Sequence, residues 1–155
     1  MILIIIYLFI DLMALISIFV LFQLQLMPNW IINIKLLVYC MLLGGLGGFI
    51  YCSRAIYVNY CVNKKWDPYW NIWYYIRPIV SCVSGAVSWL FLKSGLLILD
   101  STQKIDSSNL GFYALAFIAG YNVDKFMNKI EQISEATWGI EKSRSSKLSN
   151  NSIRK

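Results

Sequence analysis

The chain has 155 residues, of which 58% are hydrophobic and 14% are charged, and its formal net charge is +6. Because a soluble domain carries roughly 25% charged residues, this composition excludes an ordinary soluble globular protein. We interpret the positive charge as a topology signal and an attraction to anionic lipid, not as a sign of nucleic-acid binding.

The apolar runs predict an all-α membrane protein with four transmembrane helices. The first run covers residues 1–22 and contains one charge, Asp11, and the second covers residues 31–52 with Lys35 near its edge. Each run matches the length of about 20 residues that a helix needs to cross a bilayer. No positive leader or small-residue cleavage site accompanies the first run, so we expect it to stay as a membrane anchor.

The connection over residues 53–77 is predicted to be a cytoplasmic loop with an interfacial helix. Asp67 can cap a helix whose first position is Pro68, and the aromatic residues that follow favour the headgroup layer. We expect this helix to bend into the third span at Pro78. The alternative is that the aromatic side chains grip a ligand.

The third span is predicted at residues 78–99 and the fourth at residues 110–127. Residues 128–142 then form a cytoplasmic amphipathic helix, and residues 143–155 form a disordered basic tail. Apolar residues of this last helix follow a coiled-coil-like spacing, which predicts a seam for another copy or a cytoplasmic partner. The seam residues are Phe126, Ile130, Ile133 and Ile140. The alternative is a helix that lies on the protein's own loop or on the lipid surface.

Basic residues set the expected orientation. They gather in the connection 53–77 and after residue 123, so both termini are predicted to be cytoplasmic in a multi-pass protein of the bacterial inner membrane. The four cysteines lie in spans or on the cytoplasmic side, where no disulfide is expected. Since the chain has no histidine and no close cysteine pair, we expect no zinc site and no cofactor.

Four glycines cluster in the segment MLLGGLGGFIYC of the second span. A phosphate-binding loop needs a lysine after its glycines, whereas here Phe49 continues an apolar run. We therefore predict that Gly44 and Gly48 form a helix-packing G-x-x-x-G pair, facing the third span or a neighbouring subunit. Gly85 and Gly120 are predicted packing residues of the later spans.

Candidates for a pore or a coupling site are few. Asp11 lies near mid-bilayer, where a charge costs about 2.5–3.5 kcal/mol, and it is a functional candidate by default. The alternative is a neutral acid that hydrogen-bonds a neighbouring helix. Ser81, Ser84 and Ser88 share one helix face, either as an aqueous path or as a contact surface. Without histidine these serines have no activating base, so no enzyme activity is expected.

Residues 77–129 resemble a two-helix module of uncharacterised bacterial inner-membrane proteins. The resemblance rests on Arg77 and Pro78, on Gly85, and on the turn FIAGYN at residues 117–122. Such proteins are similar to small multi-span subunits of antiphage defence operons. The resemblance implies a homo-oligomeric pore-forming effector or sensor that acts with a cytoplasmic partner. A small proton-coupled transporter and a membrane immunity protein that binds a toxin are the alternatives.

Overall fold

The computed structural model describes residues 2–26, 28–64, 66–95 and 109–140. The chain divides into two compact units, residues 1–123 and residues 124–155, and each is described by itself. Within the described ranges the regular structure is helical throughout. The predicted tail 143–155 and the end of the predicted third span lie outside these ranges.

The first two long helices follow the predicted apolar runs. Helix α1 covers Ile2–Gln23, the short α2 covers Asn29–Ile32, and α3 covers Lys35–Ile56. A π-helical turn, η1 (Tyr57–Val62), extends α3, so that the helical segment Lys35–Val62 has 28 residues. The second helix is therefore longer than residues 31–52, because its apolar and aromatic residues continue past Cys52.

The segment before α4 has the predicted cap. The Asp67 carboxylate accepts a hydrogen bond of 3.0 Å from the Tyr69 backbone N–H, and Pro68 starts the 3-10 turn η2 (Pro68–Trp70). Helix α4 then covers Asn71–Lys93 with Pro78 inside it. The predicted boundary at Pro78, between the connection 53–77 and the third span 78–99, is thus wrong, because one helix continues through it. A proline removes one hydrogen bond, and the tight packing of α4 against α3 keeps the helix continuous.

The helices formed by the fourth apolar run also differ in their bounds from the expected ones. Helix α5 covers Leu110–Tyr121 and ends at Asn122, whose φ of −118° and ψ of 55° are not helical. Helix α6 follows as Val123–Trp138. Gly139 has a φ of +67°, a left-handed conformation that ends a helix readily at glycine. The predicted helix over 128–142 therefore stops at Trp138, before Ile140.

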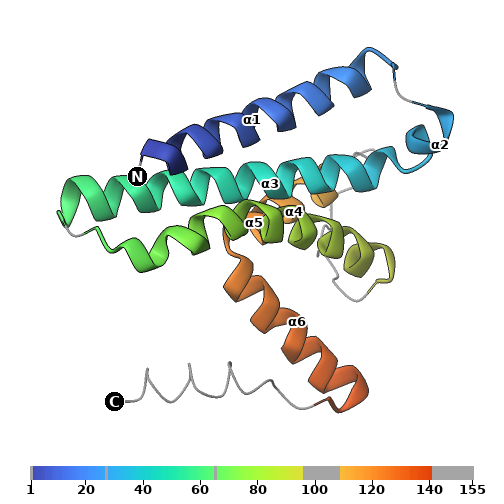
Figure 1. Ribbon diagram of the computed structural model, residues 1–155. Helices are drawn as coiled ribbons and strands as arrows, with labels where there is room; N and C mark the ends of the chain where they lie inside the picture. Colours follow the sequence, from blue (N-terminus) through green and yellow to red (C-terminus); the bar gives the residue numbers. More distant parts are fainter. Residues whose placement is uncertain (1, 27, 65, 96–108, 141–155) are drawn as a thin grey trace. The chain divides into compact units, whose positions relative to one another are not determined.

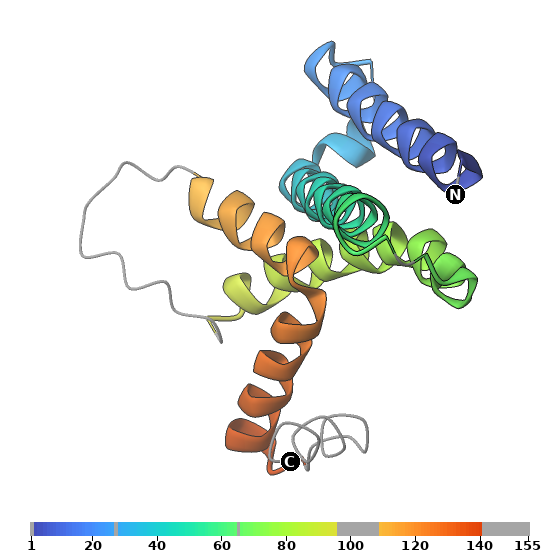
Figure 2. The ribbon, with the colours of Figure 1, turned by 90° about the vertical axis from the view of Figure 1, so that its left-hand side faces the viewer.

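In the first unit α3 is the central helix. It lies between α1 on one side and the pair α4 and α5 on the other (Figures 1 and 2). One end of α1 is anchored by Ile4 and Leu8, which are buried against Cys52 of α3 and Tyr74 of α4. The Tyr7 hydroxyl also donates a hydrogen bond of 3.0 Å to the Tyr75 carbonyl.

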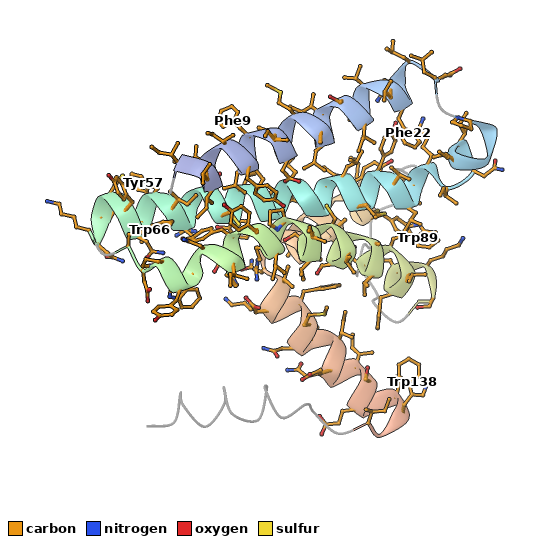
Figure 3. The ribbon with its side chains drawn as sticks, in the orientation of Figure 1. Phe9, Phe22, Tyr57, Trp66, Trp89 and Trp138 are labelled. Carbon is orange, nitrogen blue, oxygen red and sulfur yellow. The ribbon has the colours of Figure 1, made fainter. Side chains whose placement is uncertain are left out.

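Helix α1 is enclosed much less than its neighbours. In the most apolar 18-residue window of each helix, 11% of the residues are buried in α1, compared with 39% in the α3 segment and 33% in the α4 segment. Phe9 points away from the other helices, whereas Phe22 points toward α3 (Figure 3). Most of the α1 surface is therefore apolar and uncovered, as expected for a helix that faces lipid.

Among the described residues, three helices are long and apolar enough to cross a membrane: α1, the α3 segment and the α4 segment. The apolar α5 has 12 residues and is shorter than such a span. The architecture is that of a helical protein compatible with a membrane.

Candidate functional site

Backbone contacts join α3 to α4 at the predicted packing glycines. A Cβ atom built on Gly44 would lie 2.5 Å from the Ser81 carbonyl oxygen and 2.9 Å from the Gly85 Cα atom. A Cβ on Gly48 would overlap the Ser81 side chain, and one on Gly85 would overlap the Cys40 carbonyl. No side chain fits at these positions, so the two helices approach at backbone distance, as small residues allow in membrane proteins.

Helix α5 packs on a second side of the same glycine cluster. A Cβ on Gly47 would lie 2.5 Å from the Phe117 carbonyl oxygen and 2.7 Å from the Tyr121 nitrogen. A Cβ on Gly120 would overlap the backbone of Gly44. The glycine segment of α3 therefore contacts both α4 and α5, and we call this region the three-helix junction: Gly44, Gly47, Gly48, Ser81, Gly85 and Gly120.

The three candidate serines are buried at or beside this junction. Ser81, Ser84 and Ser88 each have an exposed fraction of 0%. The Ser81 hydroxyl donates a hydrogen bond of 2.9 Å to the Gly120 carbonyl of α5. The hydroxyls of Ser84 and Ser88 donate to carbonyls of α4 itself, those of Val80 and Gly85. Within the described part of the chain these serines are buried contact residues.

Asp11 faces the other helices, not the open surface of α1. Its Oδ2 atom is buried and has no hydrogen-bond partner among the residues that the structure describes. Tyr7, Cys52 and Cys82 lie close enough to interact electrostatically with the carboxyl group. One turn further along α1, the Leu15 side chain lies beside Gly45 of α3, and the Cys82 sulfur atom lies beside the same glycine. The carboxyl group thus lies in a largely apolar space between α1, α3 and α4.

Sequence reasoning overlooked the environment of Arg77. This residue was considered as a basic residue of the connection and as the start of the resembling module, but its side chain is buried, with 4% exposed. Its guanidinium carbon lies 4.5 Å from the centre of the Tyr51 ring and 5.1 Å from that of Trp73, both within cation–π distance. The signal was present as an arginine four residues after a tryptophan, a spacing that places both on one helix face.

The aromatic residues of the connection include both cavity-lining and exposed side chains. Trp66 stacks on Tyr74 with ring centres 5.6 Å apart, and both help to line a cavity of about 290 Å³. Tyr69 is 92% exposed and Trp70 is 59% exposed, which suits a membrane interface. Trp70 also lines the cavity, so the interfacial and the ligand interpretations of this connection share that residue.

The predicted seam lies largely on α6. Phe126, Ile130 and Ile133 are within the helix, whereas Ile140 follows its end at Trp138. The α6 sequence alternates these apolar positions with acidic and basic residues, so one helix face is apolar.

Comparisons of the chain with protein-family models, with curated proteins and with solved structures found no match.

Proposed function

We propose that the protein is an oligomeric, multi-pass protein of the bacterial inner membrane that permeabilises the membrane to ions along a path between subunits. The observation that carries this proposal is the Asp11 carboxyl group, which has a buried oxygen without a hydrogen-bond partner among the described residues. An intramembrane acid of this kind is expensive and marks an ion or proton pathway by default.

The packing within one chain supports a path between chains. The three-helix junction is closed by backbone contacts and by buried serines. Helix α1, in contrast, is loosely enclosed and carries Asp11 on the side that faces α3 and α4. A rotation or separation of α1 would bring the carboxyl group to an interface with another subunit and admit water. In the proposed ion-conducting state, α1 therefore leaves α3 and α4 of its own chain and packs against another subunit.

We assign four crossings with both termini in the cytoplasm. Basic residues gather in the connection between α3 and α4 and after α5, and positive loops stay cytoplasmic. Helix α5 has 12 residues, a length of about 18 Å at 1.5 Å per residue, and it crosses a bilayer only if the bilayer thins locally. Its backbone contact with Gly44 favours insertion alongside α3.

Helix α6 is the proposed contact with a second copy or a cytoplasmic partner. Its apolar face carries Phe126, Ile130 and Ile133, of which Phe126 is already buried within the chain, so Ile130 and Ile133 form the accessible part of the seam. A helix with one apolar face binds a complementary apolar groove or a like helix. By analogy with the resembling module of residues 77–129, the partner is a soluble sensor of phage infection.

The direct test is ion leakage from vesicles that contain the purified full-length chain. We expect the wild-type oligomer to release potassium, and Asp11→Asn to reduce this release on the order of tenfold if one desolvated charge, worth about 1.5 kcal/mol, is lost from the path. Asp67→Asn is the matched control, because it removes a carboxylate outside the spans and asparagine is an equally good cap.

Each alternative outcome has a distinct reading. A monomeric chain that never leaks, or an Asp11→Asn variant that leaks like the wild type, would refute the pore proposal. Flux that requires an imposed proton gradient would identify a transporter. Protection of cells from a toxin without any leakage would identify an immunity protein. Loss of phage resistance in cells that express Asp11→Asn would support the defence setting.

A further inference from the structure

An apolar cleft separates the second half of α1 from α3. Its volume is about 560 Å³, within the range of about 300–1,000 Å³ that is typical of ligand pockets. Its walls are aliphatic and aromatic, and include Leu12, Ile16 and Phe19 of α1, Leu42 and Leu46 of α3, and Tyr113 of α5. Ile16 and Phe19 are about half exposed, so the cleft lies beside the uncovered face of α1.

A polar pocket of about 440 Å³ adjoins one end of the cleft. It is lined by Asn33, Lys35 and Asn109, among others, and none of the described residues that line it is acidic. The cleft and the polar pocket have Gln23, Tyr39 and Tyr113 in common. An apolar space therefore opens directly into a polar one with a positive charge, which is the arrangement that an amphipathic molecule requires.

Tyr39 lines both the apolar cleft and the polar pocket. It is 9% exposed, and its hydroxyl oxygen has no hydrogen-bond partner within the described part of the chain. The ring is held by Phe19 and Phe22 of α1, at centre distances of 5.8 and 5.7 Å. A buried hydroxyl without a partner is costly, so a bound acceptor at this position would stabilise the site.

Lys35 supplies the charge at the polar end. Its side chain is exposed, and its Nζ atom lies 5.4 Å from the centre of the Tyr39 ring. Lys35 and Tyr39 both line the polar pocket, so a positive charge and a hydroxyl donor border the same space.

We propose that this cleft holds one anionic phospholipid. An acyl chain occupies the apolar cleft, an ester oxygen accepts the Tyr39 hydroxyl, and the phosphate lies beside Lys35. A lipid fits better than a soluble ligand because the cleft runs along apolar helices and is bordered by their exposed faces. The site is separate from Asp11, and its occupancy is measured without any ion flux, so its failure would leave the proposed function untouched.

The test is native mass spectrometry of the full-length chain after incubation with vesicles of equal parts phosphatidylglycerol and phosphatidylcholine. We expect one phosphatidylglycerol per chain. Lys35→Gln should reduce its retention about fivefold relative to phosphatidylcholine, since a basic residue near an anionic lipid contributes that much preference. Tyr39→Phe should weaken retention about fivefold through the lost hydrogen bond. Ile16→Trp should fill the cleft and abolish binding.

Two matched variants serve as controls. Lys93→Gln removes another lysine that lies over an aromatic ring, 4.8 Å from the centre of Trp89, and Ile18→Trp adds the same bulk to α1 away from the cleft. Both should retain the lipid. Circular dichroism checks helix content, and Leu43→Phe fills the same cleft if Ile16→Trp does not fold.

Three results would overturn the proposal. The first is full retention of phosphatidylglycerol in a folded cleft-filling variant. The second is equal retention of both lipids by the wild-type chain. The third is a loss in Lys93→Gln as large as that in Lys35→Gln.

Discussion

Gly44 of α3 and Gly120 of α5 meet backbone to backbone. A Cβ atom on Gly120 would overlap the carbonyl oxygen, the carbonyl carbon and the Cα atom of Gly44, so no larger residue fits without moving a helix. These two glycines are 76 positions apart in the sequence, and they show that α5 is built into the same core as α3 and α4.

The first prediction concerns this glycine contact. Gly120→Ala and Gly44→Leu should each destabilise the protein by about 1–3 kcal/mol, because the overlapping atoms are backbone and no rotamer change relieves them. The measurement is the midpoint of unfolding in a detergent titration. Gly45→Ala is the control, since the atoms nearest to a Cβ there belong to the side chains of Cys82 and Leu15 and not to the backbone. Equal loss in Gly45→Ala would contradict the explanation.

The second prediction concerns the serine that connects two helices. Ser81→Ala should destabilise the protein by about 0.6–1.7 kcal/mol, the range measured for hydrogen bonds between membrane helices, because it removes the donor to the Gly120 carbonyl. Ser84→Ala should cost less, because its hydroxyl bonds its own helix at Val80. Unfolding midpoints of the two variants decide the comparison, and a larger loss for Ser84→Ala would argue against the interhelical role of Ser81.

The third prediction concerns membrane orientation and uses the natural cysteines. Cys61 is exposed in the π-helical turn after α3, whereas Cys40 and Cys52 are buried. A membrane-impermeant maleimide should label Cys61 in inverted vesicles and leave it unlabelled in intact spheroplasts, because the basic connection is expected in the cytoplasm. Labelling is read as a mass shift, and Cys61→Ser is the control. Preferential labelling in spheroplasts would reverse the assigned topology.

The fourth prediction concerns the apolar face of α6. In a chain whose four cysteines are replaced, Ile130→Cys and Ile133→Cys should each form cross-linked dimers in membranes under mild oxidation. Asn128→Cys, which is exposed on the opposite face of the same helix, should not. Bands on a non-reducing gel provide the readout. If Asn128→Cys cross-links as well as the two isoleucine positions, the contact is random collision; if none does, copies of α6 do not meet.

Local signals in the sequence predicted the helical class and one helix start. Run length identified the long apolar helices, and the Asp67–Pro68 pair identified the cap before α4. These features depend on neighbouring residues, so the sequence contains them directly. The stop at Gly139 was overlooked because the apolar spacing continues to Ile140, while the left-handed glycine ends the helix before it.

Contacts between distant residues were predicted less well. The G-x-x-x-G spacing identified Gly44 and Gly48, which lie against α4, but it gave no sign that Gly47 faces α5. Tyr39 and Lys35 were overlooked as a site because each reads as an ordinary residue at the start of an apolar run. Their significance depends on Phe19, Phe22 and Tyr113, which only the folded chain brings to them.

Helix α1 is synthesised before the residues that it contacts. Ile4 and Leu8 pack against Cys52 and Tyr74, which leave the ribosome later. In a bilayer α1 would therefore insert before α3 and α4, together with Asp11. Sixteen of its 22 residues are Ile, Leu, Phe or Val, whose combined insertion preference of about 5–10 kcal/mol exceeds the cost of about 2.5–3.5 kcal/mol for the acid. The apolar excess of α1 thus outweighs the cost of inserting the carboxyl group before α3 and α4 are present to cover it.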